Sequence, residues 1–128
     1  MFSKSLAFYL CLTIGVTIHV SLQDTPDMPP IVAACFDKIY PLTMQCVTQA
    51  YMDWNMTYNW EAPVYYDPKG QQACCSGWQA FDCYESGPVK KCNSSEQIAV
   101  KKFIADTVDY ECKHDCIHYT YHSKQCDK

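Results

Sequence analysis

The chain contains no arginine, and this absence narrows the range of its partners. Its 128 residues include ten lysines and fourteen acidic residues, for a formal net charge of −4. Arginine is the side chain that proteins favour for bidentate contacts with phosphate groups and guanine edges. An acidic, arginine-free surface therefore argues against nucleic acid and against anionic membranes as partners.

Long apolar runs are also scarce, and the one that occurs lies near the N-terminus. Leu6–Val20 is mostly apolar over fifteen residues and follows the positive charge of Lys4. That length suits a secretory signal peptide but is short of the about 20 residues that a membrane-spanning helix needs. We therefore predict a signal peptide at residues 1–23 and a secreted, extracellular single domain at residues 24–128. No later segment approaches the length of a membrane span.

Cysteine, by contrast, is abundant. A domain of about 100 residues buries only about two-thirds of its unfolded surface, and disulfides compensate in an oxidising compartment. One of the ten cysteines, Cys11, lies in the predicted signal peptide. The other nine cannot all pair within one chain, so we expect four disulfides and one spare thiol, which is either inert or joins two chains in a disulfide-linked dimer. The nine cysteines are Cys35, Cys46, Cys74, Cys75, Cys83, Cys92, Cys112, Cys116 and Cys126.

The stretch from Cys74 to Cys92 is predicted to be the hub of these disulfides, because it holds four cysteines in nineteen residues. Adjacent cysteines such as Cys74 and Cys75 seldom bond to each other, so each should reach a different segment. Trp78 and Phe81 lie within the hub at helical spacing, which places them on one shared face.

The spacing of apolar residues predicts an all-α fold. Residues 31–54 are expected to be helical, with a break or kink near Pro41, or with Pro41 beginning a second helix. Residues 71–85 are expected to form a short helix that ends at Ser86-Gly87-Pro88. The last predicted helix is capped by Asn93 or Ser94 and carries apolar residues at every fourth position, namely Val100, Ile104, Val108, Cys112 and Cys116. We therefore expect a small, disulfide-stapled helical domain, preceded by a mobile N-terminal arm at residues 24–30.

Residues 55–70 are predicted to form a long, aromatic-rich loop, since Pro63, Pro68 and Gly70 break any regular pattern. The aromatic side chains have two interpretations. They are either large packing units of the core, or a binding surface, where Tyr and Trp offer contact area at little entropic cost. The candidate binding residues are Tyr51, Trp54, Tyr58, Trp60, Tyr65, Tyr66 and Trp78.

Two glycosylation sequons occur, at Asn55-Met56-Thr57 and at Asn93-Ser94-Ser95. In a secreted chain such a sequon indicates a position that faces solvent. The second sequon directly follows Cys92, where a neighbouring disulfide would crowd it. Asn55 and Asn93 are the candidate glycosylation sites.

Patterns for metal binding are weak. His114, His118 and His122 recur every four residues and would share one face if the last helix reached His122, with Asp115 as an acidic ligand for zinc. The interpretation we favour is a solvated polar face, because no HExxH pattern and no second ligand cluster accompany them. No metal and no cofactor are therefore expected.

Patterns for catalysis are equally weak. Residues 112–116 (CKHDC) resemble the His-Asp pair of secreted phospholipases A2, but Cys74-Cys75 lies far upstream and the four glycines form no calcium loop. No Gly-x-Ser-x-Gly elbow occurs, and oxidised cysteines cannot act as nucleophiles. We expect a protein that is not an enzyme.

The Cys-Cys-x7-Cys-x8-Cys pattern from Cys74 to Cys92, with Trp78 after the adjacent cysteines, resembles small secreted cysteine-rich proteins of arthropods without assigned function. The chain also resembles insect odorant-binding proteins, which carry a Cys-x3-Cys pair on one helix, here Cys112 and Cys116. It departs from them in that only Cys126 follows this pair. Venom and salivary proteins of arthropods share the signal peptide, the small size and the dense cysteines. None of these likenesses supplies functional residues.

Two hypotheses of function follow, and both are binding rather than catalysis. The first is a toxin-like or effector protein that engages a protein partner through an exposed surface. The second is an odorant-binding-like carrier of a small hydrophobic ligand, held in a closed cavity of at least about 300 Å³. That cavity would be lined by Trp54, Trp78, Phe81 and Phe103. A third possibility is a matrix protein that the spare thiol links to another chain.

Overall fold

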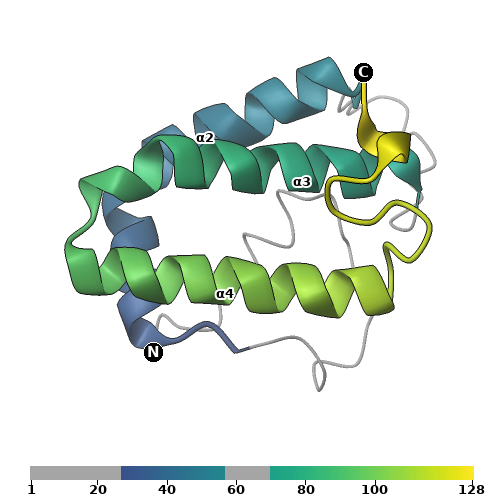
Figure 1. The fold of residues 1–128 in the computed structure, drawn as a ribbon. Helices are drawn as coiled ribbons and strands as arrows, with labels where there is room; N and C mark the ends of the chain where they lie inside the picture. Colours follow the sequence, from purple (N-terminus) through teal and green to yellow (C-terminus); the bar gives the residue numbers. More distant parts are fainter. Residues whose placement is uncertain (1–26, 57–69) are drawn as a thin grey trace.

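The computed structural model describes residues 27–56 and 70–128, and within these ranges the chain forms helices and no strand. The α-helices of these ranges are α2 (Pro30–Asp53), α3 (Gln71–Ser86) and α4 (Ser94–Lys113), and the short 3-10 helices are η1 (Pro88–Lys91) and η2 (Lys124–Cys126). Figure 1 shows α3 and α4 running in opposite directions, and both contact α2. The predicted all-α, disulfide-stapled class is confirmed. None of the described helices is long and apolar enough to cross a bilayer.

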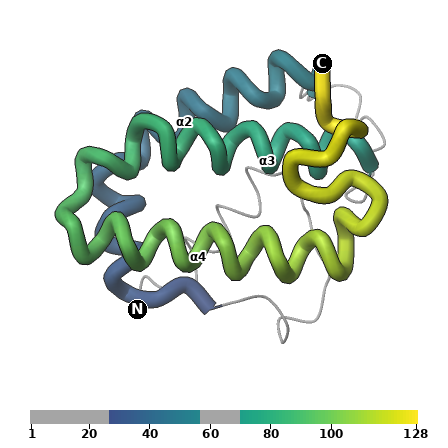
Figure 2. The backbone as a smooth tube through the Cα atoms, viewed as in Figure 1, coloured from purple at the N-terminus to yellow at the C-terminus, as the bar shows by residue number. Residues whose placement is uncertain are grey.

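Helix α2 is continuous through Pro41, so the predicted break and the predicted second helix are wrong. Proline is favoured in the first turn of a helix, where Pro30 lies, but inside a helix it removes one backbone hydrogen bond and kinks the chain. Figures 1 and 2 show α2 changing direction along its length. The bend allows the two ends of α2 to pack against different parts of the fold. Met28 is buried and Pro30 begins α2, so the helical fold starts within the segment predicted as an arm.

The core is a cluster of aromatic rings between α2 and α3, and aliphatic residues of α4 extend it. Edge-to-face contacts join Phe36 to Tyr84 at 5.9 Å and Phe81 to Tyr84 at 6.0 Å between ring centroids. Trp78 lies 6.2 Å from Phe81, which confirms that the two share a face. Each such ring pair contributes about 0.5–1.5 kcal/mol beyond its buried area. Burial also raises the pKa of the Tyr84 hydroxyl.

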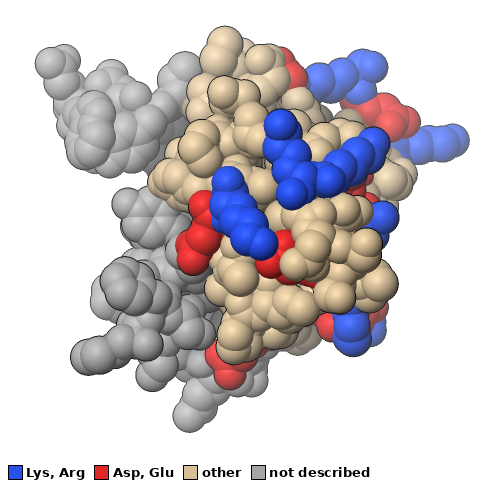
Figure 3. Space-filling model, turned by 90° about the vertical axis from the view of Figure 1, so that its left-hand side faces the viewer, with Lys and Arg blue, Asp and Glu red and all other residues tan. Residues whose placement is uncertain are grey.

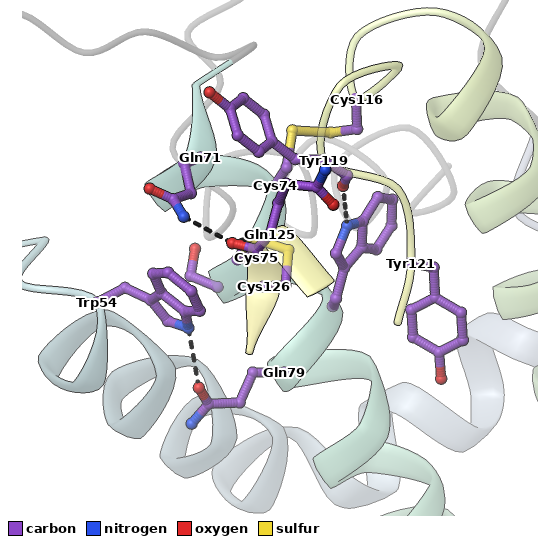
Figure 4. The surroundings of a disulfide bond; sticks show 12 residues. Trp54, Gln71, Cys74, Cys75, Gln79, Cys116, Tyr119, Tyr121, Gln125 and Cys126 are labelled. Carbon is purple, nitrogen blue, oxygen red and sulfur yellow. Dashed lines mark hydrogen bonds between the residues drawn. A yellow bond between two sulfur atoms is a disulfide. The ribbon is translucent and has the colours of Figure 1, made fainter. Parts of the chain in front are cut away.

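Four disulfides join the helices, namely Cys35–Cys92, Cys46–Cys83, Cys74–Cys116 and Cys75–Cys126. Cys35–Cys92 joins α2 to the residue before the N-cap of α4, and Cys46–Cys83 joins α2 to α3. The other two leave adjacent residues at the start of α3 and reach different points of the C-terminal segment, as Figure 4 shows. The prediction of a hub is therefore confirmed.

Helix α4 ends at Lys113, one turn earlier than the spacing of its cysteines suggested. The amide of Cys116 donates to the carbonyl oxygen of Glu111 at 2.8 Å, in a turn that takes the chain away from the helix axis. Cys116 is thereby placed to bond with Cys74, while Cys112 stays on the helix as the free, half-buried thiol. The sequence listed Cys112 among the nine cysteines expected to share four disulfides and one spare thiol, and among the described residues the spare thiol is Cys112. The backbone amide of Tyr121 lies 3.4 Å from the Cys112 sulfur.

The start of α4 is fixed by a capping box, as predicted, formed by Asn93 and Glu96. The Asn93 side chain accepts from the Glu96 amide at 2.9 Å, and the Glu96 carboxylate accepts from the Asn93 amide at 3.0 Å. Lys38 of α2 donates to the same carboxylate at 2.6 Å. Together, the bond from Lys38 and the bond from the Asn93 backbone hold the pKa of Glu96 below its usual value. The Glu96 carboxylate therefore both caps α4 and contacts α2.

The free thiol can be tested by alkylating the unreduced protein in denaturant. Among residues 27–128 we expect one label, on Cys112, and none in a Cys112→Ser variant, because the other eight cysteines of this range are bonded. Mass spectrometry of peptides after stepwise reduction locates the label and the four pairs. A label on another cysteine would contradict this pairing. A doubled mass that accepts no label before reduction would show that Cys112 joins two chains.

The role of Glu96 predicts a pH dependence of stability. A carboxyl group whose pKa is lower in the folded than in the unfolded chain stabilises the fold above its unfolded pKa, and this contribution is lost as the pH falls through the folded pKa. Glu96→Gln should therefore be less stable than the wild type at pH 7, and the difference should shrink in acid. Urea unfolding at a series of pH values measures this difference.

The matched control for Glu96 is Asp109→Asn, which removes an exposed pair with Lys113. Such surface pairs contribute little, so this variant should follow the wild type at every pH. If the Glu96→Gln difference is instead constant with pH, the hydrogen bonds rather than the charge account for it.

Candidate functional site

The structure separates the aromatic residues that were predicted to bind. Tyr58, Trp60, Tyr65 and Tyr66 lie outside the described residues. Trp78 is only 4% exposed and is a core residue, whereas Tyr51 and Trp54 are half-buried. Tyr51 packs against the core, which leaves Trp54 as the described candidate that borders the surface.

Trp54 follows the end of α2, and Figure 4 shows its ring hydrogen-bonded to Gln79 of α3. Its indole nitrogen donates to the Gln79 side chain at 3.0 Å, and its carbonyl oxygen accepts from Gln72 at 3.1 Å. The ammonium group of Lys128 lies 4.3 Å from the ring centroid, a cation–π contact. The indole itself is thus held by two neighbours, Gln79 and Lys128, while Gln72 holds the Trp54 backbone.

Asp53, beside Trp54, is held by two amide side chains. Gln79 donates to one carboxylate oxygen at 2.5 Å and Gln49 donates to the other at 2.8 Å. These two hydrogen bonds lower the pKa of Asp53, with a smaller contribution from the Lys128 charge. We call Asp53, Trp54 and Gln79 the Trp54 corner.

The outer face of α2 leads from this corner into an open hollow of about 360 Å³, which we call the α2 groove. Its residues follow helical spacing along one face, and none of them is charged. Met52 is 65% exposed. Gln49 belongs both to the groove and to the hydrogen bonds of Asp53, so the groove and the Trp54 corner are continuous. The lining residues are Pro41, Met44, Gln45, Thr48, Gln49 and Met52.

The polar groups of the α2 groove are partly paired within the helix itself. Thr48 donates its hydroxyl to the Met44 carbonyl oxygen at 2.9 Å, and the Gln49 amide donates to Asp53. The groove is consequently more apolar than its composition suggests, and methionine side chains adapt to irregular partners. Sequence reasoning missed this surface. The signal was present, since Met44, Thr48 and Met52 recur every four residues opposite the cysteine-bearing face.

The three histidines predicted to share a helix face do not do so, because α4 ends before all of them. His122 instead lies 3.1 Å from a carboxylate oxygen of Asp82, and its ring stacks on Tyr121 at 3.8 Å between centroids. Tyr121 also donates its hydroxyl to Asp82. Burial is the larger cause, and this hydrogen bond the next, of a raised pKa of Tyr121. These contacts fasten the C-terminal segment to α3.

The described residues contain one group of three potential metal ligands, formed by Cys35, Cys92 and Glu96. Its two sulfurs are joined in a disulfide, and Glu96 is engaged by Lys38 and by the helix cap. None of these three ligand atoms is therefore available to an ion in this structure. Metal binding gains no support from this group.

The two sequons lie on exposed asparagines. Asn93 is exposed although the neighbouring Cys92 is buried, and its side-chain oxygen is used by the helix cap. An N-linked glycan attaches to the amide nitrogen, which this hydrogen bond leaves unused. Asn55 is exposed with a positive φ of 54°, and Thr57 of its sequon lies outside the described residues.

Occupancy of Asn93 can be separated from its capping role with two variants. Ser95→Ala destroys the sequon but keeps the cap, so it should lose the mass of a glycan without losing stability. Asn93→Ala removes both, and should also lose about 1 kcal/mol of stability, as helix caps do. Intact mass spectrometry of protein secreted by a eukaryotic host, with urea unfolding, measures both effects. An unchanged mass in Ser95→Ala would show that Asn93 carries no glycan.

Comparison with known proteins does not assign this surface to a family. The chain matches no protein-family model, no curated protein and no solved structure. The α2 groove and the Trp54 corner therefore have to be interpreted from their own geometry and chemistry.

Proposed function

We propose that the chain is a secreted, toxin-like or effector protein that binds a protein partner in the α2 groove and at the Trp54 corner. The observation that carries this proposal is the uncharged, methionine-bearing hollow that continues into a fixed tryptophan. Four disulfides support an extracellular location, since such bonds persist in oxidising compartments.

The chemistry of the α2 groove suits a protein partner with an apolar ridge, such as one face of a helix. None of the residues that line the groove is ionised, so covering the groove itself carries a small electrostatic penalty of desolvation. The adjoining Asp53 carboxylate is ionisable and accepts hydrogen bonds from Gln49 and Gln79. Exposed Met52 and the adjoining Trp54 are side chains that contribute strongly to protein interfaces. Gln45 adds a polar group at the margin that is able to pair with a partner's backbone.

The rigidity of α2 supports the same proposal. The Cys46–Cys83 bond joins the middle of α2 to α3, and the Thr43 hydroxyl donates to the Tyr40 carbonyl oxygen at 2.9 Å. A surface that is already ordered loses less conformational entropy when it binds. A small stapled domain can therefore bind firmly through one helix face.

A carrier of a small hydrophobic ligand is the second candidate, and the volume of the α2 groove favours it. About 360 Å³ lies above the lower bound of about 300 Å³ for ligand pockets. The groove is open, however, and none of the four aromatic residues expected to line a cavity contributes to it. Trp78 and Phe81 pack against each other in the core, with Phe81 only 3% exposed. A carried ligand would thus occupy the surface of α2 rather than the interior.

The proposal predicts that charge placed in the α2 groove abolishes binding. A display of extracellular proteins is screened with the wild type, with Met44→Glu/Met52→Glu and with Ile117→Glu, a matched change at an exposed apolar residue elsewhere. A partner that binds the wild type and the Ile117 variant should bind the double variant about tenfold or more weakly, as for the loss of an interface hot spot. Equal binding by all three proteins would contradict the groove as the site.

Native mass spectrometry decides between the two candidates. Protein purified from a secreting host should show no bound small molecule if the partner is a protein. An adduct that disappears on denaturation, and that the Met44→Glu/Met52→Glu variant lacks, would establish the carrier instead.

A further inference from the structure

Three lysines at one end of the molecule have no acidic partner among the described residues. Other lysines are engaged: Lys38 with Glu96, Lys102 with Asp106 and Lys113 with Asp109. Lys128 contacts the Trp54 ring and the Asp53 carbonyl oxygen. The described lysines without an acidic partner are all exposed. Lys124 lies in η2, and the other three, which lie near the turn from α3 to α4, are Lys90, Lys91 and Lys101.

The fold brings these three lysines to the same region. Lys90 and Lys91 form the end of η1, and the Gln97 side chain of α4 donates to the carbonyl oxygens of Lys90 and Cys92, at 3.3 and 2.7 Å. Lys101 follows Gln97 by four residues, so it lies on the same face of α4, one turn further on. Figure 3 shows several lysines on the end of the molecule that carries the turn from α3 to α4, with acidic side chains between and beside them.

Glu96, which lies five residues from both Lys91 and Lys101, does not cancel this charge. Glu96 is 5% exposed, and its carboxylate is engaged by Lys38 and by the cap of α4. Lys90, Lys91 and Lys101 thus form a local group of positive charges on a chain whose net charge is −4, and Glu85, near the end of α3, is half-buried. We call Lys90, Lys91, Lys101 and the adjacent Ile98 the basic surface.

The backbone beneath the basic surface is fixed. The Cys35–Cys92 disulfide ties the end of η1 to α2, Val89 is fully buried, and the capping box holds the first turn of α4. The side chains therefore project from an ordered base, and binding there would order only the lysine side chains themselves.

Ile98 distinguishes this surface from a purely ionic one. It is 71% exposed and precedes Lys101 by three residues, which places the two side by side on α4. An exposed aliphatic side chain surrounded by lysines is best matched by a partner that offers an apolar side chain surrounded by acidic side chains. A sulfated polysaccharide has no such contact, and one isoleucine with three lysines on an acidic chain is a weak anchor for a bilayer.

We infer that the basic surface is a second interaction site, which binds an acidic region of a protein that also carries an apolar residue. It shares no residue with the α2 groove, so the inference does not depend on the proposed function. Opposite charges across the contact would fix the orientation of the partner and speed association, while the acidic remainder of the chain would repel the same partner elsewhere. Asn93 of the sequon follows Lys91 by two residues, so a glycan there would shield this surface.

The test uses the full mature, disulfide-bonded chain with Ser95→Ala as background, so that no glycan at Asn93 interferes. The probe is a short fluorescent peptide of glutamates and leucines, and binding is followed by anisotropy. We expect binding that weakens with salt and that falls about tenfold or more in Lys90→Glu/Lys91→Glu/Lys101→Glu. The control Lys102→Glu/Lys113→Glu/Lys124→Glu has the same net charge and should bind nearly as well as the background.

Two further measurements keep the inference falsifiable. Ile98→Ser should weaken binding of the leucine-containing peptide but not of a peptide with glycines in place of the leucines. Met44→Glu/Met52→Glu should bind the peptide normally, which separates this site from the α2 groove. Circular dichroism and the count of disulfides confirm that each variant is folded.

The inference would be overturned if both triple variants lost binding equally, because net charge alone would then explain it. It would also be overturned if heparin, or vesicles of phosphatidylcholine and phosphatidylserine, bound more tightly than the peptide while Ile98→Ser had no effect. Tighter binding of heparin would indicate a polysaccharide ligand, and tighter binding of the vesicles would indicate a membrane surface.

Discussion

The pair of bonds that leaves Cys74 and Cys75 is the constraint on which the rest of this structure depends. Neighbouring residues at the start of α3 are tied to Cys116 and Cys126, so one turn of helix fixes two points of the C-terminal segment. Trp78, one turn further along α3, then donates to the Tyr119 carbonyl oxygen at 2.7 Å and contacts the Tyr121 ring. The C-terminal segment, which has little regular structure, is thereby joined to α3 by two disulfides and a hydrogen bond. Each disulfide contributes about 3–4 kcal/mol in the chain-entropy model, a large share for a domain with a small core.

The small size of the domain also explains why its aromatic residues are divided between core and surface. A small domain has few positions that are fully shielded from water, and Trp78, Phe81 and Tyr84 occupy them. The outer faces of the helices, whose inner faces pack in the core, are left at the surface. The outer face of α2 carries apolar residues without charge, and the junction of η1 and α4 carries lysines with one exposed apolar residue. The two proposed sites therefore differ in chemistry although the same disulfides hold both.

Local spacing predicted the elements that depend on local interactions. The capping box of Asn93 and Glu96 and the shared face of Trp78 and Phe81 follow from positions three residues apart. The end of α4 could not be predicted in the same way, because the four-residue spacing continues through Cys112 and Cys116. The tertiary bond from Cys116 to Cys74 overrides that pattern. Likewise, spacing cannot identify Cys112 as the spare thiol, since pairing depends on which sulfurs meet in space. The spacing of Met44, Thr48 and Met52 marks an outward face of α2, but that this face is hollowed depends on its surroundings and could not be predicted from the spacing.

The order of the cysteines along the chain has a consequence for how damage to this protein would be recognised. The bonds Cys35–Cys92 and Cys46–Cys83 each join a residue before position 57 to one after position 69. A peptide bond hydrolysed anywhere between those positions would therefore release no fragment, and the mass would rise only by that of one water molecule. A nicked chain and an intact chain would migrate together on a non-reducing gel and separate only once the sulfurs are reduced. The integrity of purified material therefore has to be judged after reduction.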